Sequence, residues 1–317
     1  MLMNNASVNI SFFIPAYNCA STIEEAVDSI IETNFNANDE LVIVDDCSTD
    51  DTAAILDRLQ TKYACIKVIS HKYNKGGAAA RNTAIENAGN ELLFCLDSDN
   101  VLAPLSIKPL KNYLLVNDAD VASFEQQHFF QTDKYSPAYI WKLPCGELSI
   151  DCYLMGGNTP GQHGNYLFTK QSWKNAQGYA EGSGALDTWT FGLRQAITGA
   201  KMVVLKDTYY FHRLYLEKSY WMRDAEANLY SVSVKTAYAL FPFYDLINEK
   251  YLTYMLGKGR YTWFYNLKRK PLQLVQKGEK KQFYEALNKK IHNIAYPHPS
   301  LLQRALAKLK RTIKGPG

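Results

Sequence analysis

Two acidic residues stand one position apart where an apolar run ends, in the stretch "FCLDSDN" at residues 94 to 100. Asp97 and Asp99 leave that run together, and Asn100 follows them. Paired carboxylates at the end of a strand suit a hard divalent cation that is shared between the acids and a diphosphate. The pattern also arises often by chance, and a solvated turn is the alternative explanation of the pair taken alone.

The elements that position these acids follow from the periodicity of the first hundred residues. Short, nearly continuous apolar runs predict four strands, at residues 8–14, 40–44, 65–70 and 91–96. Helical patterns separate them, at residues 21–33, 49–62 and 76–88. Short apolar strands alternating with such helices indicate a parallel sheet with helices on both faces. We predict Ser21, with Glu24 three residues on, as the cap of the first helix and Gly89 as the cap that ends the third.

Polar or ring-bearing residues follow every predicted strand. The four segments are "PAYN" (15–18), "DDCSTDD" (45–51), "HKYNKGG" (71–77) and "DSDN" (97–100). Because ligands of open α/β sheets bind at the carboxyl ends of the strands, these segments predict a ligand site at one edge of the sheet.

The stretch from Val8 to about Arg213 resembles a family 2 glycosyltransferase of the GT-A fold. The motifs "FFIPAYN", "LVIVDDCSTDDT", "NKGGAAARNTAIENAGNELLFCLDSDN", "GNYLF…GYAE", "LDTWTFGLR" and "YYFHR" follow in the family's order. The resemblance implies an α/β fold with a mixed, mostly parallel sheet flanked by helices. It implies a catalytic domain at residues 1–215 and a helical, basic, aromatic-rich region at residues 216–317.

The implied activity is transfer of a sugar, with inversion, from a nucleoside-diphosphate sugar to a hydroxyl of a glycan, lipid-linked or protein acceptor. The resemblance favours UDP as the nucleotide and implies Mn²⁺ or Mg²⁺ as the cofactor. A nucleotidyltransferase that makes sugar nucleotides shares such a core, but "PAYNCAST" is not the Gly- and Arg-rich loop it needs. A nucleotide-sugar-binding protein without activity is expected to lose Asp99 or Asp187, and both are present.

For the donor, the resemblance implies contacts from all four strand ends. Tyr17 stacks on the base, Asp46 accepts from a base N–H, and Arg81 holds the donor near its ribose and phosphates. The other implied donor-binding residues are Pro15, Asn18, Lys75, Gly76, Asp97 and Ser98. From residue chemistry alone, Tyr17 also fits a packing aromatic and Asp46 a cap of the second helix.

The metal ligands implied by the resemblance are Asp97, Asp99 and His212, although a histidine in "YYFHR" also fits packing or a solvated strand end. Asp187, in "GSGALDTWTFGLR", is the implied general base. Leu186 stands where the family usually has a second acid, so it either raises the pKa of Asp187 by excluding water or marks an altered site. An acid that stabilises a helix N-terminus is the alternative explanation of Asp187.

An aromatic, glycine-rich segment from about residue 124 to residue 164 has no clean period. In similar proteins the acceptor lies on this side. His128, Trp141 and His163 are therefore candidates for the border of the acceptor pocket, and ordinary packing explains them equally well.

Charge is divided unevenly along the 317 residues. Residues 236–317 hold 16 Lys and Arg against four Asp and Glu, a net charge of +12, whereas the rest carries −8. Apolar residues at helical spacing alternate with cations at residues 299–314, which predicts a helix that binds an anionic membrane surface or packs on the protein or a second subunit. No nucleic-acid-binding module is recognisable, so we expect no nucleic-acid partner.

The cysteines and the N-terminus bear on location. The six cysteines form no short-spaced framework, which indicates reduced thiols. The first residues lack the basic and apolar regions of a signal peptide, and no apolar run is long enough to span a membrane. The sequence therefore predicts a cytoplasmic protein, peripheral at the inner face of the membrane.

Overall fold

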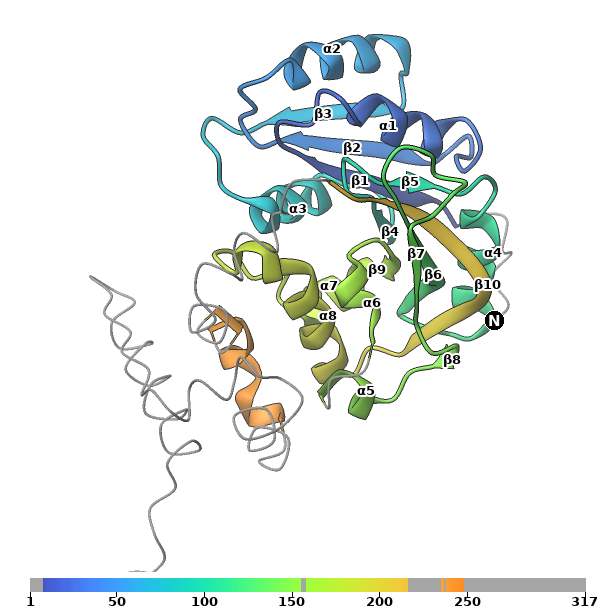
Figure 1. Cartoon of the computed structure of the whole chain (residues 1–317). Coiled ribbons are helices and arrows are strands. Elements are labelled where there is room, and N and C mark those ends of the chain that lie inside the picture. Colours follow the sequence, from blue (N-terminus) through green and yellow to red (C-terminus); the bar gives the residue numbers. More distant parts are fainter. Residues whose placement is uncertain (1–7, 155–157, 216–234, 237, 248–317) are drawn as a thin grey trace, which may run out of the picture. The chain divides into compact units, whose positions relative to one another are not determined.

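The computed structural model describes residues 8–154, 158–215, 235–236 and 238–247. The chain divides after Ile247, and all of these residues belong to the first unit. The unit is a mixed α/β structure whose central sheet is flanked by helices (Figure 1). This is the predicted fold class.

The four predicted strands are confirmed and pair in parallel in the order β3-β2-β1-β4. They are β1 (Ile10–Ala16), β2 (Glu40–Asp45), β3 (Ile66–Ser70) and β4 (Leu92–Cys95). The register places Ala16 beside Asp45 and Asp45 beside Ser70. Since these three strands end at the same level, the polar segments that follow them meet at one edge of the sheet.

The sheet continues beyond β4 with antiparallel as well as parallel neighbours. The further strands are β5 (Val101–Leu102), β6 (Val121–Phe130), β7 (Tyr139–Lys142), β8 (Gly146–Glu147), β9 (Leu167–Thr169) and β10 (Met202–Arg213). Strand β9 pairs antiparallel with β4 and β6, whereas β10 runs parallel to β6. The short strand β9 therefore joins the parallel half of the sheet to the half formed by β6, β10 and β5.

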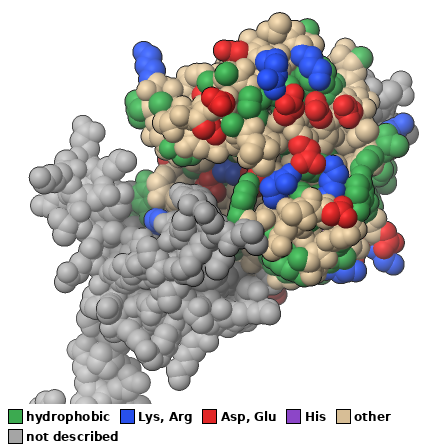
Figure 2. Space-filling view, turned by 45° about the horizontal axis from the view of Figure 1, so that its top comes forward, with side chains coloured by type: hydrophobic (Ala, Val, Ile, Leu, Met, Phe, Trp, Pro, Cys, Tyr) green, Lys and Arg blue, Asp and Glu red, His purple; other side chains and the backbone are tan. Residues whose placement is uncertain are grey.

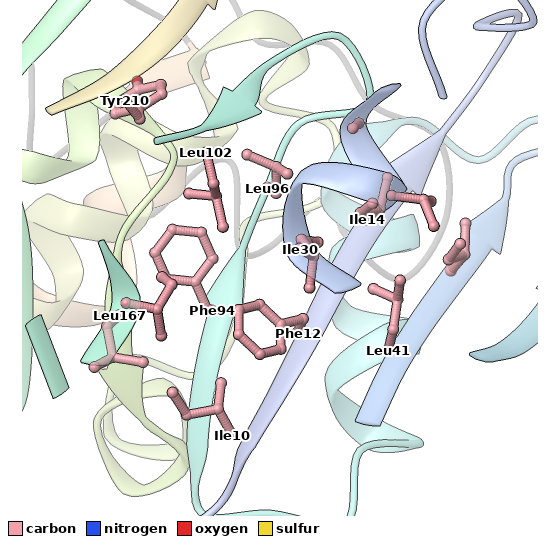
Figure 3. Packing of buried hydrophobic residues seen from close by; sticks show 14 of the residues in the cluster. Ile10, Phe12, Ile14, Ile30, Leu41, Phe94, Leu96, Leu102, Leu167 and Tyr210 are labelled. Carbon is pink, nitrogen blue, oxygen red and sulfur yellow. The ribbon is translucent and has the colours of Figure 1, made fainter. Parts of the chain in front are cut away.

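Helices cover both faces of the sheet, as predicted. On one face, buried apolar side chains of α1 (Ile23–Ile31), α2 (Thr52–Lys62) and α4 (Ile107–Val116) share one core with alternate residues of β1. Figure 3 shows Phe12 and Ile14 of β1 with Ile30 of α1 in this core. On the other face lie α3 (Gly77–Glu86) and α8 (Asp187–Ile197) (Figure 1). There the ring of Phe168 contacts both Phe13 and Phe191, which ties β1 to α8 through β9.

Two predicted helix caps are wrong. Helix α1 begins at Ile23, and its first amides donate to the main-chain carbonyl of Cys19, so Ser21 is not needed as a cap. Helix α3 ends at Glu86 with Asn87 at its C-cap. Gly89 instead donates its amide N–H to the carboxylate of Glu40.

The remaining helical elements pack around α8. They are α5 (Ile150–Leu154), α6 (Pro160–His163), α7 (Lys170–Asn175), η1 (Gly184–Leu186) and η2 (Phe241–Leu246). In η2, the ring of Phe243 lies 5.0 Å from the guanidinium carbon of Arg194. The compact unit thus continues past the boundary that we predict at residue 215.

All six cysteines lie in the described ranges and are unpaired, in agreement with the prediction of free thiols. In the part of the chain that the structure describes, every helix is too short or too polar to span a membrane. The predicted surface helix at residues 299–314, and most of the predicted region 216–317, lie outside the described residues.

Helices α6 and α8 approach so closely that their backbones touch. A Cβ atom on Gly192 would lie 2.7 Å from the Cα of Gly161. We therefore expect Gly192→Ala to lower the free energy of unfolding by about 1–3 kcal/mol through overpacking. Urea denaturation measures this change. The control is Gly89→Ala, whose Cβ would meet only the carboxylate end of Glu40; equal stability losses in the two variants would contradict the close approach.

Candidate active site

One buried arginine links two acids that are far apart in the sequence. Arg81, on α3, donates from Nη2 to Oδ1 of Asp97 at 2.7 Å and from Nη1 to Oδ2 of Asp187 at 2.6 Å. Its guanidinium carbon lies 5.7 Å from the centre of the Tyr179 ring. The structure thus brings together three predicted site residues: the first acid after β4, the arginine of α3 and the first residue of α8.

Asp187 is almost enclosed by protein. Its other oxygen accepts the amide N–H of Thr188 at 2.7 Å, as expected of an acid at a helix N-terminus. Burial raises the pKa of Asp187, and the nearby positive charge of Arg81 opposes that rise. Leu186, directly before it, is also buried.

Gly77 allows this arrangement to form. A Cβ atom at Gly77 would lie 2.8 Å from Nη1 of Arg81 and 3.0 Å from Oδ2 of Asp187. The first turn of α3 therefore has room for the ion pair only because residue 77 has no side chain.

Asn165 is a site residue that the sequence motifs contain but do not reveal. Its Oδ1 accepts the amide N–H of Asp97 at 2.7 Å, and its Nδ2 donates to Oδ2 of Asp97 at 3.0 Å. Asn165 is completely buried, just before β9. Both carboxylate oxygens of Asp97 are thereby oriented, one by Arg81 and the other by Asn165.

Asp99 and His212 lie at the same edge of the sheet, but their side chains do not converge on one point. Oδ2 of Asp99 accepts the hydroxyl of Tyr215 at 2.9 Å. Burial, together with the charge of Asp97, raises the pKa of Asp99 to about 6. Burial lowers the pKa of His212 to about 4, and its buried Nδ1 has no hydrogen-bond partner in the part of the chain that the structure describes. Among the described residues, no three His, Cys, Asp or Glu side chains are gathered as a complete metal site.

These donors nevertheless fit a cation that shares its coordination with a ligand. Mg²⁺ in phosphate-transfer sites is held by one or two carboxylates, with phosphate oxygens and water completing the coordination. Asp97 and Asp99 supply two such carboxylates, and the unpartnered nitrogen of His212 is a further donor. The chemistry of the set suits a divalent cation together with a diphosphate.

Asp46 has a different environment from either explanation suggested by the sequence. Its two oxygens accept the amide N–H groups of Lys75 at 2.9 Å and Gly76 at 2.7 Å. One oxygen also lies 2.6 Å from Nδ1 of His71. Asp46 does not cap α2, whose N-cap is Asp51. Its contact with a base stays a prediction.

His71 is a second site residue that the sequence alone does not single out, although the polar segment at residues 71–77 contains it. It is buried between Asp46 and Thr83, whose hydroxyl lies 3.0 Å from its Nε2. The pair holds the turn before α3, where Gly76 has a φ of 90° that favours glycine. A pocket of about 260 Å³ lies against this turn, lined by Asn74, Lys75, Gly76, Gly77, Ala78, Gly182 and Gly184.

The first two strand ends are joined by Asn18. It accepts the amide N–H of Thr49 at 2.7 Å and donates its own N–H to Ser48 at 3.0 Å. Tyr17, beside it, is 49% exposed, so its ring is free to stack rather than buried in packing.

The other predicted donor-binding residues are placed as follows: Pro15 lies in β1 beside Val44, and Ser98 contacts the thiol of Cys19. On the face shown in Figure 2, acidic and basic side chains are interspersed and do not separate by sign. A larger cavity, of about 350 Å³, lies at the amino ends of the strands and so is remote from this edge. It is lined by Asn9, Asn36, Ala37, Asn38, Lys108, Lys111 and Asn112.

Strand register separates the three candidates for the acceptor border. Trp141 of β7 pairs with Gln127, whereas His128 pairs with Ile140, so Trp141 and His128 face opposite sides of the sheet. The ring of His128 stacks on Tyr209, 4.3 Å away.

Phe129, the neighbour of His128 in β6, points the other way and contacts both Tyr139 and His212. Trp141 therefore shares the face of His212, and His163 lies beside it, with ring centres 4.7 Å apart. His128 points to the opposite face, so it does not share one border with Trp141 and His163.

Comparison with known proteins shows the family to which the chain belongs. Residues 11–174 match the model of glycosyl transferase family 2. The chain is 35% identical over 138 residues to the Escherichia coli UDP-Glc:alpha-D-GlcNAc-diphosphoundecaprenol beta-1,3-glucosyltransferase WfaP, covering 42% of this chain and 47% of that protein. The chain therefore belongs to glycosyltransferase family 2, and the matched segment spans less than half the length of this relative.

Two solved structures have similar folds. Staphylococcus aureus TarS 1-349 in complex with UDP-GlcNAc has a TM-score of 0.63 at 19% identity, covering 91% of this chain and 82% of that one. The mannosyltransferase PcManGT from Pyrobaculum calidifontis, in complex with GDP-Man and Mn²⁺, has a TM-score of 0.51 at 16% identity, covering 96% and 79%. At these identities the likeness confirms the fold alone.

The Arg81 ion pairs predict a large stability effect. Arg81→Ala leaves two mostly buried carboxylates without their cation, so we expect the free energy of unfolding to fall by about 3–5 kcal/mol. Arg58→Ala is the control, because its ion pair with Glu24 is exposed and such pairs contribute about 0–1 kcal/mol. Urea denaturation at neutral pH compares the two variants. A loss in Arg81→Ala no larger than in Arg58→Ala would show that the two acids do not depend on Arg81.

Proposed function

We propose that this protein transfers a sugar, with inversion, from a UDP-sugar to a hydroxyl of a lipid-linked or polymeric glycan. The observation that carries the proposal is the pair of ion pairs from Arg81 to Asp97 and Asp187. It joins an acid suited to hold a donor to an acid suited to act as a base, at the carboxyl edge where α/β sheets bind ligands.

Names of similar proteins support the substrate classes. WfaP uses UDP-Glc and acts on a GlcNAc that is linked to diphosphoundecaprenol, and the TarS structure contains UDP-GlcNAc. WfaP is a beta-glucosyltransferase. Since the sugar of UDP-glucose is α-linked, a β product requires inversion at the anomeric carbon. We extend the donor, the acceptor class and the inversion to this chain as parts of the proposal.

In the proposed reaction Asp187 takes the proton of the acceptor hydroxyl as that oxygen attacks the anomeric carbon. Burial has already raised the pKa of Asp187, which favours a base. Both of its oxygens accept hydrogen bonds from the protein in the structure described. Each of these oxygens keeps a second lone pair, which can accept the proton of the acceptor hydroxyl.

Local charge supports a cation in the donor site. Asp97 and Asp187 share the guanidinium of Arg81, Asp99 lies near the guanidinium of Arg213, and a diphosphate adds further negative charge. When bound by Asp97 and Asp99, Mn²⁺ or Mg²⁺ supplies the neutralising charge for the diphosphate that leaves. Asn165 and Arg81 hold the carboxylate of Asp97 in the orientation that such a site needs.

Metal dependence is tested by removing the metal and one ligand. We expect UDP to bind in calorimetry with Mn²⁺ or Mg²⁺ and to bind at least about tenfold more weakly in EDTA, because the diphosphate loses its counter-charge. Asp99→Ala should abolish both the metal effect and turnover. Asp207→Ala, at an exposed acid of β10, is the control that should keep both. Equal UDP affinity in EDTA with full turnover would contradict the proposed metal site.

The role of Asp187 is tested by separating binding from chemistry. Asp187→Asn keeps the shape of the side chain but removes the base, so turnover should fall by about a hundredfold or more. Nucleotide affinity in the same variant should stay within about threefold of the wild-type value. Steady-state rates and calorimetry of UDP measure the two quantities. Normal turnover would place the base elsewhere and would point to an altered site marked by Leu186.

A further inference from the structure

The imidazole of His163 is buried and makes no hydrogen bond with any residue that the structure describes. The residue is 2% exposed, and both ring nitrogens lack a partner within those residues. Burial lowers the pKa of His163 well below its ordinary value, so the neutral ring presents one N–H donor and one acceptor nitrogen. Buried polar groups are nearly always paired in native structures, so each exception needs a physical reason.

The surroundings of His163 are otherwise well satisfied. Its main-chain carbonyl accepts from Nδ2 of Asn165 at 3.0 Å and from the hydroxyl of Tyr210 at 3.1 Å. The hydroxyl of Tyr210 also contacts Nε2 of Gln127. All of these side chains are buried, so the backbone of His163 is fixed in place. The unpaired ring is therefore an isolated feature of a well-connected segment.

The segment that contains His163 lies between Asp97, the candidate donor-side acid, and Asp187, the candidate base. A Cβ atom on the next residue, Gly164, would lie 3.4 Å from Oδ2 of Asp97 and 3.3 Å from Cγ2 of Thr188. Thr188 directly follows Asp187, the candidate base. His163 is thus one residue from a point that contacts both the donor-side acid and the first turn of α8.

An aromatic surface continues from His163 toward solvent. Trp141 lies 4.7 Å from it, between ring centres, and is partly exposed. Tyr139, two residues before Trp141 on the same face of β7, is 51% exposed. Small-molecule sites combine such aromatic walls with a few polar groups that fix orientation. A sugar ring, with apolar C–H faces and many hydroxyls, matches both features.

We propose that His163 and Trp141 form the subsite that binds the acceptor sugar. The imidazole of His163 exchanges hydrogen bonds with an acceptor hydroxyl, and the exposed face of Trp141 packs against the sugar ring. The subsite rests on the proposed function, since it holds the sugar whose hydroxyl Asp187 deprotonates. It makes His163 a residue that determines acceptor specificity.

The main variant is His163→Phe, which keeps a ring against Trp141 and removes both nitrogens. UDP-glucose and UDP-GlcNAc serve as donors, with aryl glycosides of glucose, galactose and N-acetylglucosamine as acceptor probes. We expect the KM for the preferred glycoside to rise about tenfold or more, because a site built to bind a hydroxyl loses that bond. UDP affinity, and UDP release without a glycoside, should stay within about twofold. His128→Phe, on the opposite face, should change none of these values.

An unchanged glycoside KM in His163→Phe would overturn the subsite, and a raised melting temperature in that variant would then mark the imidazole as a purely structural defect. If His163→Phe does not fold, Trp141→Leu provides the same test, because it removes the partly exposed wall: a raised glycoside KM supports the subsite and an unchanged one overturns it.

Binding is also measured without turnover, by NMR of isotope-labelled histidine rings. The glycoside should shift the signals of His163 and leave those of His128 unchanged, and the absence of such a shift would overturn the subsite. A wild-type protein that consumes neither donor would contradict the proposed function separately, because the glycoside shift at His163 does not require the donor.

Discussion

The buried guanidinium of Arg81 is the interaction on which the site depends. It draws together the end of β4, the first half of α3 and the start of α8, which are separated by up to 106 residues. Two carboxylates in a poorly solvated position repel each other unless a cation is shared between them. Gly77 has no side chain, and the backbones of Gly161 and Gly192 touch. Both features let α8 approach α3 and α6 closely enough to bring Asp187 within reach of Arg81.

Asp46 is a second buried acid, and it fixes the turn that leads into α3. Asp46 accepts two successive amides of the turn before α3 and pairs with His71, so the end of β2 determines where α3 starts. Arg81 then lies one turn along that helix. The position of the guanidinium is thus set by Asp46 from one side and by Asp97 and Asp187 from the other. Such support from buried neighbours is what a catalytic arrangement needs in order to hold its geometry.

The parts of the structure that the sequence predicted are those that depend on short-range pattern. Four strands and the edge at which Asp97 lies follow from apolar runs and the polar residues after them. Asn165 was not predicted, because its partner Asp97 is 68 residues away and the two meet only through the pairing of β9 with β4. The direction of His128 was not predicted, because β6 is buried on both faces and its side chains do not alternate in polarity.

The short segment from His163 to Asn165 couples the two halves of the site. Asn165 orients Asp97 with its side chain and, through the same amide group, holds the carbonyl of His163. Under the proposed function, a displacement of Asp97 on donor binding would therefore be transmitted to the backbone that carries the His163 ring. Because interiors are close-packed, a shift on one side of such a segment is felt on the other rather than absorbed. This connection offers a physical route by which the donor would set the position of the acceptor sugar. Asp97, on the donor side, and the carbonyl of His163, on the acceptor side, both bind the buried side-chain amide of Asn165.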